Sequence, residues 1–150
     1  MKRIMACIMA ALMLCAALAP ALADSEVAPL NGALAALNDA YGALEDSSVA
    51  ITHAYLLEVA DRDALSEHGA ALFGECDACV YIIAEQTVAG FAIPYIMEIC
   101  YLVGADGSVQ LSESGLNTMN AYAWQDEYAG ISITDVTEAA LAGWPVANAE

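Results

Sequence analysis

The sequence predicts an α+β domain in which an antiparallel β-meander packs against one or two helices. Three observations lead to this fold class. Residues 29–46 place apolar side chains three or four positions apart, which is typical of an amphipathic helix. From Ala78 onward, short runs rich in β-branched and aromatic residues alternate with turn residues, as in consecutive strands. A chain of 150 residues also suits a single domain with one core.

Residues 1–23 have the composition of a secretory signal peptide. Two basic residues precede the apolar run Ile4–Ala19, and Ala21–Ala23 supplies small residues at the cleavage positions. The apolar run is shorter than the roughly 20 residues that a membrane-spanning helix needs. We therefore predict a secreted protein, extracellular or periplasmic, with one mature domain at residues 24–150 and no stable membrane insertion.

The mature chain is strongly acidic. All 20 Asp and Glu residues follow the predicted leader, and Arg62 is its one remaining Lys or Arg. Such a surface repels phosphate backbones and anionic lipid headgroups, which argues against nucleic acid as a partner. It keeps an apolar chain soluble, or it attracts a basic protein.

The first predicted element is a helix that begins near Pro29 and ends at Asp46–Ser48. Its apolar residues share one face: Leu30, Leu34, Leu37, Tyr41 and Leu44. Residues 49–61, VAITHAYLLEVAD, fit either a strand or a helix face, and we favour a strand. Residues 63–74, DALSEHGAALFG, predict a short helix that Asp61 or Asp63 caps and Gly74 ends.

Two strand-like runs, ACVYIIAEQTV and IPYIMEICYLV, then flank a bend at Ala89–Gly90. A hairpin centred on this bend pairs Val80 with Ile99 and Cys79 with Cys100. The same register predicts one apolar face, which holds Val80, Ile82, Ala84, Tyr95, Met97 and Ile99.

A second hairpin follows at once. Ala105-Asp106-Gly107 fits a three-residue loop with glycine in the left-handed position. This loop pairs Val103 with Val109 and Tyr101 with Leu111. Further strands are predicted at residues 108–114, 120–125 and 129–136, with a closing helix at 137–144.

Three cysteines remain after the predicted leader, and an exported protein meets oxidising conditions. Directly opposed residues of a hairpin lie close enough for a bridge, so Cys79–Cys100 is the first choice of disulfide. Cys76 is then the spare thiol, or the alternative partner of Cys100.

The spacing Cys76-Asp77-Ala78-Cys79 also matches that of thiol redox centres, which need a thiol with a lowered pKa. Here the motif runs into a strand, and Glu75 and Asp77 oppose a thiolate, so a structural bridge is the favoured interpretation. A zinc site built from the three cysteines and His68 would lack a second close ligand pair. The sequence predicts no metal, no cofactor and no catalytic residue, and therefore a protein that is not an enzyme.

Residues 86–90, QTVAG, lie at the predicted bend and resemble the Gln-x-Val-x-Gly hairpin of the cystatins, inhibitors of papain-like cysteine proteases. The resemblance implies a cystatin-like fold and a partner-binding site. The site residues would be Gln86, Thr87, Val88, Ala89 and Gly90. The expected function is a secreted cystatin-like binding module that inhibits such a protease through this hairpin. The alternative is an acidic extracellular interaction domain without inhibitory activity.

Overall fold

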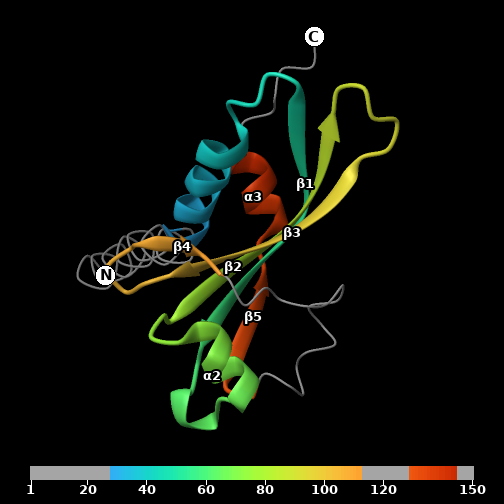
Figure 1. Cartoon of the computed structure of the whole chain (residues 1–150). Helices are drawn as coiled ribbons and strands as arrows, with labels where there is room; N and C mark the ends of the chain where they lie inside the picture. Colours follow the sequence, from blue (N-terminus) through green and yellow to red (C-terminus); the bar gives the residue numbers. More distant parts are fainter. Residues whose placement is uncertain (1–27, 113–128, 145–150) are drawn as a thin grey trace, which may run out of the picture.

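Five antiparallel strands form one sheet, in the order β4-β3-β2-β1-β5, in a computed structural model that describes residues 28–112 and 129–144 (Figure 1). The strands are β1 Ser47–Val59, β2 Ala78–Val88, β3 Tyr95–Val103, β4 Val109–Leu111 and β5 Ile131–Asp135. The helices are a first helix at residues 28–41, α2 Glu67–Phe73 and α3 Thr137–Gly143, with a 3-10 helix at Arg62–Ala64. Strands β1 to β4 form the meander, and β5 returns to pair with β1. The α+β prediction is therefore confirmed. The predicted leader and the strand expected at residues 120–125 lie outside the described residues.

One face of the sheet is covered by the first helix and α3 (Figure 1). Leu30, Leu34 and Leu37 of the first helix are buried there, as their spacing predicts. The helix ends at residue 41, however, and not at Asp46–Ser48. Glycine at position 42 is a poor helix former, and Ser47 already belongs to β1, so Leu44 is left exposed.

The other face packs against α2. Its buried cluster joins Leu72 and Phe73 of α2 to side chains of three strands: Tyr55, Leu57, Cys79, Tyr81, Cys100 and Leu102. Neither Asp61 nor Asp63 caps α2; the cap is Ser66, whose hydroxyl accepts a hydrogen bond from the Gly69 N–H at 3.0 Å. Asp61 caps the preceding 3-10 helix instead. None of the helices in the described part of the chain combines the length and the apolar character that a bilayer crossing requires.

A β-bulge at Thr52 explains the mixed periodicity of β1. The register with β2 shifts between Ile51 and His53, and the Thr52 hydroxyl donates to the Ile83 carbonyl at 3.1 Å. Ile51 and Ala54 consequently face the same cluster although they are three positions apart. Before the bulge the odd-numbered residues face this cluster, and after it the even-numbered residues do. No single alternation of buried and exposed residues therefore holds through the strand. The strand prediction for residues 49–61 is confirmed.

The β2–β3 hairpin forms where predicted, but its register differs by two residues. Val80 pairs with Tyr101 instead of Ile99, and the ladder ends at the pair Gln86–Tyr95. In the predicted register Pro94 would lie within the ladder, where it has no N–H to donate. The wider loop, residues 89–94, places Pro94 beyond the last pair. A shift of two preserves which face each side chain occupies, so the predicted apolar face is found, except that Tyr95 is exposed.

The β3–β4 hairpin has the predicted register. Val103 pairs with Val109 and Tyr101 with Leu111. The N–H of Gly104 donates to the Ser108 carbonyl at 2.9 Å, which leaves the three-residue loop at 105–107. Gly107 has a φ of 80°, the left-handed conformation that this loop requires.

Candidate functional site

The β2–β3 hairpin extends beyond the two packed faces of the sheet. Burial ends at Ala84 on β2 and at Ile99 on β3. The loop, the last residues of β2 and the first residues of β3 project away from the helices, beside the start of β1 (Figure 1). Within the part of the chain that the structure describes, no helix covers this end of the hairpin, so another molecule can contact it.

The five predicted site residues lie together at this end. Gln86 and Val88 are half-buried, whereas Thr87, Ala89 and Gly90 are exposed. The Gln86 amide donates to the Ser47 hydroxyl at 2.9 Å, so its side chain binds β1 and does not point freely outward.

Three backbone features hold the turn in place. The N–H of Ala89 donates to the Asp46 carbonyl at 2.8 Å, and the N–H of Phe91 donates to the Val88 carbonyl at 3.1 Å. Gly90 has a φ of 86°, which a residue with a side chain seldom adopts. Because Ser47, the first residue of β1, and Asp46 just before it hold the tip, little ordering is needed when a partner binds.

Four exposed apolar side chains follow the motif directly, and two of them, Ile93 and Ile96, are the most exposed large apolar residues in the described part of the chain. The exposed fractions are 60% for Phe91, 78% for Ile93, 49% for Tyr95 and 72% for Ile96. We call these four residues the hairpin-tip surface. The rings of Phe91 and Tyr95 contact each other with centroids 5.8 Å apart. Sequence reasoning missed this surface, although the run FAIPYI was a usable signal, because turns are usually built from polar residues, glycine and proline.

Acidic side chains border the hairpin-tip surface. Glu85 pairs with Ile96 across the ladder, and Glu98 lies two positions farther along β3 on the same face. Both are exposed, as is Asp46 beside Ala89. The tip is therefore an apolar projection with negative flanks.

The three cysteines lie on the α2 side of the sheet. Cys79 and Cys100 are 0% and 4% exposed, and their sulfurs are 2.6 Å apart. Both are free thiols in this structure. Because of the register shift, Cys79 faces Leu102 and Cys100 faces Tyr81. The two cysteines are thus diagonal neighbours, not directly opposed ones. The hydrogen bond to Cys100, followed by burial, raises the pKa of Cys79 well above its ordinary value.

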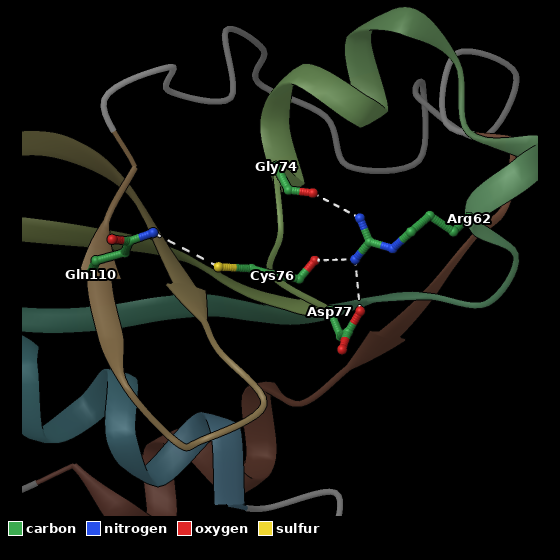
Figure 2. Close-up of polar contacts among 5 residues, drawn as sticks. All are labelled: Arg62, Gly74, Cys76, Asp77 and Gln110. Atoms are coloured by element: carbon green, nitrogen blue, oxygen red, sulfur yellow. Dashed lines mark hydrogen bonds and ion pairs between the residues drawn. The ribbon is translucent and has the colours of Figure 1, made fainter.

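Cys76 occupies a different environment, in the loop before β2. It is half-buried, and its sulfur accepts a hydrogen bond from the Gln110 amide of β4 at 3.7 Å (Figure 2). Cys76 lines an open groove of about 650 Å³ between the end of α2 and the β3–β4 hairpin.

Arg62 fixes the loop that carries Cys76. Its guanidinium donates to the carbonyls of Gly74 at 2.7 Å and Cys76 at 2.8 Å, and it pairs with Asp77 at 2.7 Å (Figure 2). The ion pair is exposed and contributes little by itself. The two carbonyl contacts define the path of the chain between α2 and β2.

Among residues 28–112 and 129–144, no three His, Cys, Asp or Glu side chains are arranged to hold a metal ion. His53 and His68 are both exposed. The motif Cys76–Cys79 enters β2 directly, so it does not precede a helix N-terminus, the usual means of activating a thiol.

The chain was also compared with protein-family models, with curated proteins and with solved structures, and it matches none of them.

Proposed function

We propose that this protein is a binding module that inserts the tip of the β2–β3 hairpin into a cleft of a partner protein. The observation that carries the proposal is the hairpin-tip surface, four large apolar side chains on a braced hairpin beyond the sheet's packed faces. Phe91 and Tyr95 contact each other, and exposed apolar side chains that gather in this way are typical of protein interaction sites.

The free energy available from burying the hairpin-tip surface is sufficient only if the tip is already ordered before it binds. Fully burying Phe91, Ile93 and Ile96 would contribute at most about 4.5–9 kcal/mol, at about 1.5–3 kcal/mol for each side chain, because each is already partly covered. A micromolar complex needs about 8 kcal/mol after all ordering costs are met. The tip meets this requirement only if those costs are small, and the hydrogen bonds of Ala89 and Phe91 support that condition.

The first partner class to test is the papain-like cysteine proteases, because Gln86–Gly90 resembles the cystatin hairpin. With Gln86 bonded to β1, the residues that would enter the cleft are Ala89, Gly90 and Phe91. They combine a narrow tip with one aromatic contact. The module would bind in the cleft without presenting a cleavable peptide.

The test is to titrate a papain-like protease with the mature chain and to follow hydrolysis of a small substrate. We expect inhibition between nanomolar and micromolar concentrations. Gly90→Trp should abolish it, because the side chain would fill the tip. Gly107→Trp is the matched control: Gly107 is also at a turn with positive φ and open surroundings, but at the other end of β3. It should inhibit like the wild type.

No inhibition at high micromolar concentration would reject the protease as partner. Equal losses in both tryptophan variants would reject the tip as the contact. The second candidate is the acidic interaction domain, which the negative flanks at Glu85, Glu98 and Asp46 favour. In that case the chain should capture a basic protein and release it as salt rises, because exposed charges are screened.

We also propose that Cys79 and Cys100 form a disulfide in the exported protein. Their sulfurs are 2.6 Å apart, so a bond can form with little movement of either strand. Peptide mapping without reductant should identify this pair. Replacing both residues with serine should lower the free energy of unfolding by about 3 kcal/mol, the entropy of closing a loop of this length. Alkylation of both thiols in denaturant without reductant would contradict the bond, and a Cys76–Cys100 peptide would replace it.

A further inference from the structure

We propose that Cys76 is a thiol–disulfide exchange site, through which a low-molecular-weight disulfide oxidises the buried Cys79–Cys100 pair in the folded protein. The inference rests on the proposed Cys79–Cys100 bond and adds the route by which that bond forms and is reduced. It assigns a role to Cys76, the cysteine that is not part of the proposed disulfide.

The route is needed because the pair is inaccessible. Cys79 and Cys100 lie between β2, β3 and α2, packed against Leu72 and Phe73. A soluble disulfide therefore meets neither sulfur unless this side of the domain opens.

Cys76 is accessible and adjacent at the same time. It lines the groove of about 650 Å³, together with Gln110 and Ser112. On its inner side Cys76 packs against the cluster that contains Cys79 and Cys100. A charge on Cys76 also raises the pKa of Cys79, although it is the smallest of the four effects on that thiol. Cys76 is thus the one cysteine of the described residues that lines the groove and also packs against the cluster of the buried pair.

The groove suits a small peptide disulfide. Gly74, Gly104, Ser108 and Ser112 contribute polar backbone and hydroxyl groups to its lining. The Gln110 amide donates a hydrogen bond to the sulfur from the β4 side. Arg62 holds the carbonyls of Gly74 and Cys76, which keeps the attacking residue at the mouth of the groove.

The exchange balances in three steps. The Cys76 thiolate attacks the small disulfide, so that a mixed disulfide forms and one small thiolate leaves. Cys79 then attacks the sulfur of Cys76 and releases the second small thiolate. Finally Cys100 attacks Cys79, which forms the Cys79–Cys100 bond and frees Cys76. Two protein thiols are oxidised, one disulfide is reduced to two thiols, and the two protons lost by the protein end on those thiols.

The experiment uses the reduced, folded mature chain and oxidised glutathione as the probe. Samples are acid-quenched over time and analysed by mass spectrometry and peptide mapping. We expect the wild type to form Cys79–Cys100 and Cys76→Ser to do so at least tenfold more slowly. Cys79→Ser lacks the resolving thiol, and it should accumulate glutathione on Cys76. Ser132→Ala, at an exposed position of β5 outside the groove, is the control and should oxidise at the wild-type rate.

Oxidation of Cys76→Ser at the wild-type rate would overturn the inference, and so would a glutathione adduct that persists on Cys76 in the wild type. Oxidation during refolding from denaturant separates the two proposals. If Cys76→Ser gains the Cys79–Cys100 bond during refolding, the proposed disulfide is supported independently of the route through Cys76. If neither protein gains it, the disulfide itself is wrong. The Cys79→Ser adduct tests the site even if Cys76→Ser folds poorly.

Discussion

Replacing Gly130 with alanine is expected to lower the free energy of unfolding by about 3–5 kcal/mol, whereas Gly107→Ala should lower it by only about 1 kcal/mol. Both glycines have a φ of 80°, so each substitution incurs the same backbone strain. They differ in their surroundings. A Cβ on Gly130 would overlap the Asp61 carbonyl oxygen and would lie 3.2 Å from backbone atoms of Ala64 and Leu65, while a Cβ on Gly107 meets nothing within 4 Å.

The backbone at Gly130 has no freedom to move away. Its carbonyl accepts hydrogen bonds from the N–H groups of Ala60 at 2.8 Å and Asp61 at 3.0 Å. These bonds join the end of β1 to the turn that leads into β5. A displaced Gly130 would lose both bonds and disturb the pairing of Val59 with Ile131.

Urea unfolding followed by circular dichroism gives both free energies, with Gly107→Ala as the matched control. A difference between the variants reports the steric overlap alone, because the strain cancels. Equal losses would show that the chain between β1 and α2 yields easily, in which case this turn does not fix the position of β5.

The local elements of this fold can be predicted from the sequence because their signals are local. The spacing of Leu30, Leu34 and Leu37 predicts the first helix, and the loop before Ser108 predicts the β3–β4 register. The face of each residue in β2 and β3 was also predictable, since a shift of two residues leaves it unchanged. The apolar face of the meander therefore follows from alternation alone.

Other features depend on contacts distant in the chain. Nothing local tells β5 to pair with β1, because the paired residues are 72 positions apart at Val59–Ile131 and 80 apart at Tyr55–Asp135. The bulge at Thr52 is set by the register with β2, which shifts between Ile51 and His53, and by the hydrogen bond from the Thr52 hydroxyl to the Ile83 carbonyl. In the candidate site, the motif located the hairpin end, but the exposure of Phe91, Ile93 and Ile96 depends on where the helices stop covering the sheet.

Alkaline pH is expected to destabilise this fold strongly because two buried tyrosines resist ionisation. The Tyr81 hydroxyl donates to the Glu98 carboxylate at 2.6 Å. Burial, reinforced by this bond, raises the pKa of Tyr81 far above its ordinary value. Burial, with a smaller effect from Tyr41, also raises the pKa of Tyr101. In the unfolded chain both would ionise near pH 10.

Stability from these groups is fully present below about pH 10 and is lost as pH rises toward the folded-state pKa. In that window the unfolded chain has released protons that the folded protein retains, so unfolding becomes easier. Each such group lowers the free energy of unfolding by about 1.4 kcal/mol per pH unit. Urea unfolding at several values between pH 8 and 12 measures this slope.

Tyr81→Phe should be less stable than the wild type by about 1 kcal/mol at pH 8, because one hydrogen bond is lost. Glu98 is exposed and remains solvated after the substitution. Above pH 10 the variant should lose stability more slowly than the wild type, so the two curves converge. Parallel curves up to pH 12 would contradict a protonated Tyr81 in the folded state.

The same titration distinguishes the two states of the cysteine pair. In the dithiol form the raised pKa of Cys79 adds a further loss of stability that begins near pH 8.5, where an unfolded thiol ionises. In the disulfide form Cys79 has no proton to release, so that loss disappears while the tyrosine loss above pH 10 remains. The oxidised protein should therefore hold its stability from pH 8.5 to 10, and the reduced protein should decline there. Identical curves for the two forms would place Cys79 in contact with solvent, contrary to its burial under α2.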